Sequence, residues 1–421
     1  MIERPVRVFE AADAAEYAHD VVHHDPKTPR AHLLVPVDDA AAVAGITALS
    51  LELRSLPPTI RDALANAESS AGQISADRLQ GLAELIQNAD DVGAKHAEII
   101  VDEDRSCLMF RHDGAALTLH DVWALAIPWL SLKVDDADLL GRFGIGLKTL
   151  HALSETLDVH QGHFRVRYQE ADLAPIAEPL SEPDGTTVFV IPCEPGVISV
   201  DAVAAWLSQW SDAGLVFLAH LSTVTLRSTA GEEKARLHVQ RSKAERLEAS
   251  GGSMRRRVAT ATDSRQWAVY SRSVPAPQVG SRSRKARSKL TPLAIAFPLS
   301  GQDVGHLHVG LPVRKIGLPF RVLAQFNPLT SRRDISDDPW NHSLIPMISA
   351  LWLDAILDCF TRDPSAAWAA GPLVSELEEH LHTTAPLRET LTECLLGDAR
   401  RLLAALMTLP EGESDYRLGQ L

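Results

Sequence analysis

ELIQNADDVGA, residues 84–94, is the end of a predicted amphipathic helix over residues 77–91. Apolar residues at three- and four-residue spacing predict its buried face: Leu79, Leu82, Ala83, Ile86 and Ala89. Glu84, Asn88 and Asp91 stand at i, i+4 and i+7, within about 60° of one another on a second, polar stripe. One interpretation of this stripe is a solvated face. The other is a site in which the carboxylate activates water and the amide oxygen holds a hard cation such as Mg²⁺.

The segments after this helix predict a hairpin and then a mixed unit. The alternating runs HAEIIVD (96–102) and SCLMFRH (106–112) are joined by a short polar turn, which is typical of two antiparallel strands. Thr118 is predicted to cap a helix that runs to about Trp129. Further strands are expected at 157–161, 164–168 and 186–191, so helices and antiparallel strands share one unit that ends near Gly196.

A glycine-rich segment, GRFGIGLKTLHAL (141–153), lies inside this unit and precedes a predicted helix. Its glycines allow backbone N–H groups to approach an anion closely, and the start of a helix favours negative charge, so phosphate is the natural ligand. A Walker A loop is excluded because Leu147 separates Gly146 from Lys148. A dinucleotide fingerprint is excluded because no strand precedes the segment and position 149 is Thr. A plain turn is the other interpretation.

Four segments together resemble, in order and spacing, the boxes of the ATP-binding fold shared by gyrase, the ninety-kilodalton heat-shock chaperone, histidine kinases and MutL. These GHKL boxes are ELIQNADDVGA (84–94), HDGAALT (112–118), SLKVDDADLLGRFGIGLKTL (131–150) and DGTTVFV (184–190). The resemblance is closest to the sacsin-like branch and covers about residues 70–196. A weaker likeness to the middle domain of sacsin-like and heat-shock chaperone proteins covers 317–341.

The expected fold is therefore α+β. The resemblance implies a Bergerat-type α/β sandwich that binds ATP over 56–196, preceded by an N-terminal extension or lid over 1–55. A second α/β domain, the middle domain, is expected over 197–345, and a helical tail over 346–421.

The resemblance also implies a role for each matching residue. Glu84 would deprotonate the attacking water, and Asn88 would bind Mg²⁺ through its side-chain oxygen. Arg332 would reach the γ-phosphate, with Arg333 as its neighbouring rival and a surface salt bridge as the plain interpretation. The remaining nucleotide-binding residues are expected to be Asp91, Gly114, Gly141, Gly144, Ile145, Gly146, Lys148 and Thr186. Lys133 and Lys148 are equally interpretable as exposed lysines.

The second box departs from the family pattern at its first position. The family has an aspartate there that accepts the adenine amino proton, whereas this chain has His112, with Asp113 one place later. A neutral imidazole can accept one hydrogen bond, so His112 could replace the aspartate. Asp113 could instead have shifted into the role, or base specificity could be relaxed.

The resemblance therefore implies an ATPase with ATP and Mg²⁺ as ligands, in which slow hydrolysis would drive closure on an unknown protein client. One alternative is a non-hydrolysing nucleotide-sensing interaction module of a bacterial defence assembly. Another is an ATP-gated nucleic-acid clamp that uses residues 254–289, where ten basic residues accompany one acid. A run of basic residues is more often a solvated loop or, in an acidic protein, an intramolecular partner for acidic surface. A homodimer or a subunit of a larger complex remains open.

Composition narrows the class of protein. The chain has 421 residues, 45% of them hydrophobic, and a formal net charge of −14, which argues against a surface that is basic throughout. Four widely spaced cysteines form neither a disulfide framework nor a zinc spacing. We expect a cytoplasmic protein with no membrane segment. The pairs His23/His24 and His306/His308 have no evident third metal ligand, so structural or solvent-facing roles are expected for them.

Overall fold

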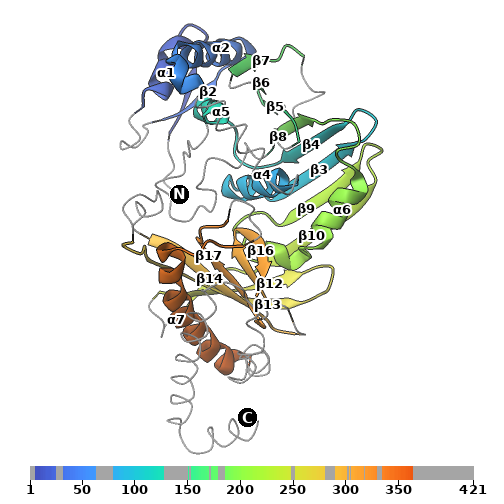
Figure 1. Ribbon diagram of the computed structural model, residues 1–421, viewed down its shortest axis with the longest axis vertical. Coiled ribbons are helices and arrows are strands. Elements are labelled where there is room, and N and C mark those ends of the chain that lie inside the picture. Colours follow the sequence, from blue (N-terminus) through green and yellow to red (C-terminus); the bar gives the residue numbers. More distant parts are fainter. Residues whose placement is uncertain are drawn as a thin grey trace, which may run out of the picture. The chain divides into compact units, whose positions relative to one another are not determined.

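The computed structural model describes residues 5–24, 32–62, 79–127, 150, 153–169, 172–178, 185–247, 252–279, 290–300, 303, 305–316, 318–329 and 334–363. These residues confirm the predicted α+β class (Figure 1). They divide into two compact units. The first holds the described residues up to Ser211 together with 218–238, and the second holds 212–217 and the described residues from 239 onward.

The first unit is built on a sheet with the strand order β9-β3-β4-β8-β5-β6-β7 (Figure 1). In this order only β3 and β9 pair in parallel. The strands are β3 (His96–Asp102), β4 (Cys107–His112), β5 (Thr156–Gln161), β6 (Phe164–Gln169), β7 (Asp172–Pro175), β8 (Thr187–Pro192) and β9 (Thr223–Ser228). The predicted hairpin is confirmed as β3 and β4, and the three predicted strands are confirmed as β5, β6 and β8.

Helices α4 (Gln80–Asp91) and α5 (Leu119–Ala126) confirm the two helices predicted around the first and second boxes. The α4 helix packs against β4. It ends before Gly93, whose φ of 80° is a backbone conformation that glycine adopts at little cost. The α5 helix begins at a capping box in which Thr118 and Asp121 each bind the other's backbone N–H.

Residues near the N-terminus form a small layer of the first unit. The elements are β1 (Val6–Phe9), α1 (Ala14–Val22), β2 (Leu33–Pro36) and α2 (Asp39–Ser55), with β1 and β2 paired in parallel. The α2 helix packs against β6 and β7, where Asp172 accepts hydrogen bonds from Ser50 and Arg54. The segment interpreted from sequence as an extension or lid is thus joined to the sheet through α2.

The apolar sequence of residues 200–221 predicts one continuous helix, and this prediction is wrong after Ser208. Helix α6 spans only Val200–Ser208, and a 3-10 turn, η2, follows at Asp212–Leu215. Ser211 between them has a φ of 49°, which interrupts helical geometry. The apolar sequence after it suggested a continuing helix, but its backbone groups find partners in other elements.

The second unit is a twisted sheet covered by helix α7 (Pro339–Arg362) (Figure 1). Its strand order is β16-β15-β17-β14-β13-β12, with β11 (Glu245–Arg246) beside β12, and the last residues of β10 (Glu233–Arg241) also pair with β12. The other strands are β12 (Met254–Thr260), β13 (Gln266–Pro275), β14 (Leu290–Pro298), β15 (His306–Val309), β16 (Leu311–Lys315) and β17 (Arg321–Ala324).

Helix α7 is the core helix of this unit. Trp340, Leu344, Leu351 and Ile356 pack from it into the hydrophobic cluster of the sheet. Among the described residues, its segment Pro339–Cys359 is the one stretch long and apolar enough to cross a membrane, and half of it is buried inside the protein. Contacts with β13 and β14 account for its apolar character.

Candidate nucleotide site

The polar stripe of α4 is largely withdrawn from solvent. Glu84 is 5% exposed and Asp91 is 8% exposed, while Asn88 between them is partly buried. Moving a carboxylate out of water costs free energy unless charged or hydrogen-bonding groups compensate. A solvated helix face would leave both carboxylates in water, so the burial excludes that interpretation of the stripe.

Asp90, the neighbour of Asp91, has a structural role. Its carboxylate accepts hydrogen bonds from the backbone N–H groups of Ala219, His220 and Leu221 at 3.0, 2.7 and 2.7 Å. These bonds hold the segment before β9 against the last turn of α4. Of the two adjacent aspartates, Asp91 therefore remains with Glu84 and Asn88 on the stripe.

The first and second boxes meet at the end of α4. The N–H of Ala115 donates to the carbonyl oxygen of Val92 at 2.9 Å. Gly114 lies so close to Val92 that a Cβ atom on it would approach the Val92 Cγ2 atom to 2.6 Å. A side chain at position 114 would push the two segments apart, so the contact depends on glycine.

Asp113 is engaged in this junction. Its carboxylate accepts hydrogen bonds from the N–H groups of Lys95 and His96 at 2.7 and 2.9 Å, and it pairs with the His96 ring at 2.7 Å. Burial by itself raises the pKa of Asp113, but the hydrogen bonds from His96 and Lys95 outweigh it and lower the pKa. The side chain thus fastens the start of β3 to the end of β4.

His112 lies on the buried face of the sheet, and one of its ring nitrogens is committed. The side chain is 6% exposed, and its Nδ1 atom accepts a hydrogen bond from the N–H of Gly114 at 3.1 Å. A ring nitrogen that accepts a hydrogen bond carries no proton, so the proton of the neutral ring is on Nε2. With the ring in this state, Nε2 is a donor, whereas the expectation from sequence was an acceptor.

Thr187 is the residue of the fourth box that lies opposite His112. The two residues are directly paired across β4 and β8, so their side chains share one face of the sheet. Thr187 is fully buried, and its Oγ1 atom has no hydrogen-bond partner in the part of the chain that the structure describes. Thr186, the predicted residue, precedes β8 and is partly exposed. The alternation of Thr187, Phe189 and Ile191 along the strand was the signal that could have identified the buried threonine.

The third box falls outside the described residues, so the predicted phosphate-binding residues Gly141, Gly144, Ile145, Gly146 and Lys148 have no structural account here, nor has Lys133. Arg332 and Arg333 also lie outside them. Leu150, the last residue of the box, is described and packs on α4. A Cβ atom on Gly81 would come within 2.4 Å of the Leu150 Cδ2 atom, so this end of the box touches the first turn of the helix that carries Glu84.

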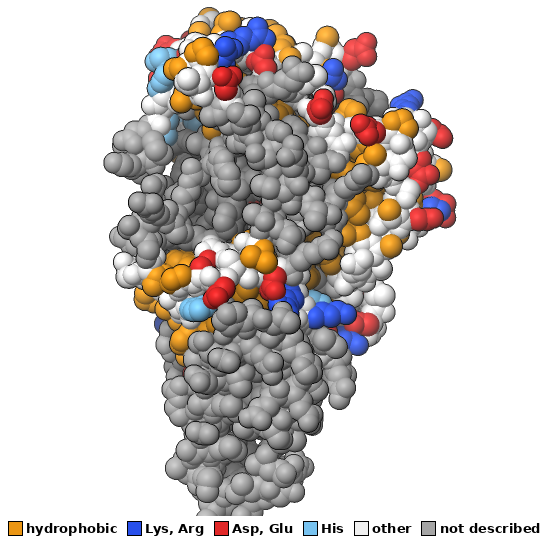
Figure 2. Space-filling model, in the orientation of Figure 1, with side chains coloured by type: hydrophobic (Ala, Val, Ile, Leu, Met, Phe, Trp, Pro, Cys, Tyr) orange, Lys and Arg blue, Asp and Glu red, His pale blue; other side chains and the backbone are white. Residues whose placement is uncertain are grey.

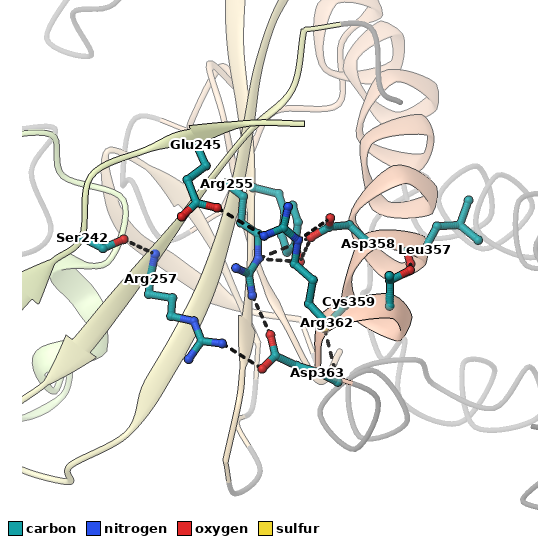
Figure 3. A network of polar contacts seen from close by, with 11 residues as sticks. Ser242, Glu245, Arg255, Arg257, Leu357, Asp358, Cys359, Arg362 and Asp363 are labelled. Carbon is teal, nitrogen blue, oxygen red and sulfur yellow. Dashed lines mark hydrogen bonds and ion pairs between the residues drawn. The ribbon is translucent and has the colours of Figure 1, made fainter. Parts of the chain in front are cut away.

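The basic segment 254–289 is described in part, and its described arginines bind groups of the same chain. Arg255 contacts Asp358 and Asp363 of the α7 region and the hydroxyl of Tyr270, and Arg257 binds Asp363 as well (Figure 3). Arg256, Arg265 and Arg272 bind the Val216 carbonyl, Asp263 and Asp354 respectively. For Arg255, Arg257, Arg265 and Arg272, the interpretation as intramolecular partners of acidic groups is confirmed. The remaining basic residues, 282–289, are outside the described part.

Of the pair His306/His308, His308 has a structural role, as the sequence predicted. The side chain is completely buried and lies edge-on to Phe217, with ring centroids 4.8 Å apart. Burial, reinforced by the positive charge of Arg321, lowers the pKa of His308 well below its usual value, so the ring is neutral.

No family model matches this chain, and no curated protein is similar to it.

Proposed function

We propose that this protein is a Mg²⁺-dependent ATPase with a GHKL-type ATP-binding domain, closest to the sacsin-like branch. Slow hydrolysis of ATP would drive conformational closure on a macromolecular client in the cytoplasm. The observation that carries the proposal is the junction of the first two boxes, where the Val92–Gly114 contact brings the end of the Glu84–Asn88–Asp91 stripe to the His112 end of β4. Segments matched to one site by sequence are expected to meet in this way.

The described residues fit a nucleotide in three respects. Thr187 offers a buried hydroxyl with no partner among the described residues, which a base could satisfy. Position 114 leaves no room for a side chain, because the Val92 Cγ2 atom lies within 2.6 Å of where a Cβ would be, and this keeps the first and second boxes in contact. Glu84, Asn88 and Asp91 supply the oxygen atoms that Mg²⁺ prefers. Asn88 would hold the metal, and Mg²⁺ would supply charge neutralisation on the phosphates.

The chain's own residues would divide the remaining work. Glu84, buried on α4, would accept the proton of the attacking water. His112 and Thr187, whose side chains share one face of the sheet, would contact the base. The third-box glycines would bind the phosphates through N–H groups, and Arg332 would stabilise the charge on the γ-phosphate.

The test compares phosphate release from ATP by wild type, Glu84→Gln and Glu84→Ala, with and without Mg²⁺. Loss of a general base is expected to lower the rate by about 10²-fold or more while nucleotide binding persists. Glu194→Gln, at an exposed glutamate after β8, is the matched control and should keep the wild-type rate. Equal rates in wild type and both Glu84 variants, or no nucleotide binding in any of them, would sink the assignment.

His112 favours a second candidate, a non-hydrolysing module that senses a nucleotide. The donor state of its Nε2 atom does not suit the amino group that the family aspartate recognises. The same experiment separates the two candidates: nucleotide binding with no Glu84-dependent phosphate release favours the sensor. If several nucleoside triphosphates bind with equal affinity, the sensor does not discriminate between bases.

A further inference from the structure

Three side chains with metal-binding chemistry converge on the surface of the first unit, outside the nucleotide site. His19 is in the last turn of α1, His23 follows as the residue that ends the helix, and Glu52 comes from α2. The two helices pack against each other. Residues four apart on a helix lie on one face, so both rings are directed to the same side. Figure 2 shows exposed histidine side chains over the region of α1.

Both rings contact the same carboxylate. The Nδ1 atom of His19 is 3.0 Å from Oε1 of Glu52, and the Nε2 atom of His23 is 3.5 Å from Oε2. The ring centroids of the two histidines are 4.2 Å apart. One ligand atom from each residue can be chosen so that all three lie within 4.8 Å of one another.

These separations suit a tetrahedral ion. Zinc binds imidazole nitrogen and carboxylate oxygen at about 2.0–2.2 Å, so two tetrahedral ligand atoms are about 3.3–3.6 Å apart. The His23–Glu52 distance lies within that range and the His19–Glu52 distance lies just below it, so small rotations of the side chains would centre an ion among the three residues. Two imidazoles and one carboxylate leave a fourth position for water or another ligand.

We propose that His19, His23 and Glu52 bind a first-row divalent transition-metal ion, with Zn²⁺ as the representative. The imidazoles select such an ion over Mg²⁺ or Ca²⁺, which take oxygen ligands. The side chains of His19 and His23 are 61% and 54% exposed, so an ion can reach them from solvent. The bound ion would tie the end of α1 to α2. The competing explanation is a pair of ordinary histidine–glutamate contacts with no affinity for metal.

The site is tested by titrating Zn²⁺ into the full chain, free of any histidine tag and of nucleotide, by isothermal calorimetry at pH 7.5. Wild type is expected to bind one Zn²⁺ per chain more than the double variant His19→Gln/His23→Gln. Loss of a group that only orients a ligand costs about 10–100-fold in affinity, so Glu52→Gln, which loses a ligand, should weaken binding at least tenfold. Zn²⁺ should raise the melting temperature of wild type but not of the double variant.

The matched control is His163→Gln. His163 is an exposed histidine whose Nδ1 atom is 2.7 Å from Oδ1 of Asp39 on α2. Like the candidate site, it pairs a histidine with a carboxylate of α2, but that contact contains no second histidine. It should leave the Zn²⁺ isotherm unchanged. Equal stoichiometry and affinity in wild type and a double variant with wild-type circular dichroism would overturn the proposal. Because nucleotide is absent, that result would leave the proposed ATPase untouched.

Discussion

At the scale of the residue, neighbouring polar side chains near the candidate site have distinct local partners. Asp90 is taken up by three backbone N–H groups and Asp113 by two, whereas Asp91 and His112 lie buried beside them. The sequence offers adjacent polar candidates at both places, Asp90 and Asp91 at one and His112 and Asp113 at the other. The hydrogen bonds identify Asp90 and Asp113 as the residues that fasten the backbone.

Thr187→Val should have opposite effects on stability and on nucleotide binding. Without ligand, the buried hydroxyl lacks a hydrogen bond in the described structure, so replacing it by a methyl group should raise the free energy of unfolding by about 1 kcal/mol. With nucleotide, the loss of a base contact should weaken binding by up to about tenfold, the equivalent of about 1.4 kcal/mol. Urea denaturation and calorimetric titration with ATP measure the two effects. Unchanged ATP affinity in Thr187→Val would remove Thr187 from the site.

At the scale of the element, sequence periodicity predicted the helices and strands whose formation depends on their own residues. The hairpin at β3 and β4 and the helix α4 follow from alternation and from three-and-four spacing, and Thr118 from its capping pattern. The false helix after α6 depended on a partner far away in sequence, because Asp90 supplies the hydrogen bonds of residues 219–221. The four-residue strand β7 was missed because so short a run shows no clear alternation.

The candidate site was also predictable only where local spacing determines it. The stripe Glu84, Asn88 and Asp91 could be found from helical spacing alone. The buried threonine of the fourth box could not be assigned from sequence, because Thr186 and Thr187 are adjacent and a shift of one residue moves a side chain to the other face of a strand. Pairing of Thr187 with His112 resolves the face, and that pairing is a property of the assembled sheet.

Asp363→Ala should loosen the end of α7. Arg255 is 6% exposed at its side chain and binds Asp363 and Asp358, so loss of Asp363 leaves a buried guanidinium with only one acidic partner (Figure 3). Breaking a buried ion pair costs about 3–5 kcal/mol, and the remaining Asp358 contact should keep the loss near the lower figure. Arg257→Ala, at a side chain 49% exposed, should cost less than about 1 kcal/mol. Chemical denaturation of the two variants compares them, and equal losses would contradict a dominant role for the buried pair.

At the scale of the whole molecule, the fold pairs the arginines of the basic segment with groups of the same chain and buries two thiols. The described arginines of the basic segment are bound within the second unit, which leaves them little capacity for an external polyanion. Burial raises the pKa of both Cys193 and Cys359 to about 11. Both thiols are therefore protonated at neutral pH and weakly nucleophilic.

Stability should fall in mild acid because His308 is buried as the neutral ring. Burial, together with Arg321 and His306, lowers its pKa in the folded protein, whereas the unfolded chain takes up the proton near pH 6.5. Stability is therefore complete above about pH 6.5, and below it the unfolded state binds one more proton. The free energy of unfolding should decrease through this group by about 1.4 kcal/mol per pH unit until the folded pKa is reached. Urea denaturation at pH 7.5, 6.5 and 5.5 measures the slope. His308→Leu has no proton to take up, so its loss between pH 6.5 and 5.5 should be smaller than that of wild type by about 1 kcal/mol, because the unfolded histidine is already half protonated at pH 6.5. Parallel losses in the two proteins would show that His308 is protonated as readily folded as unfolded.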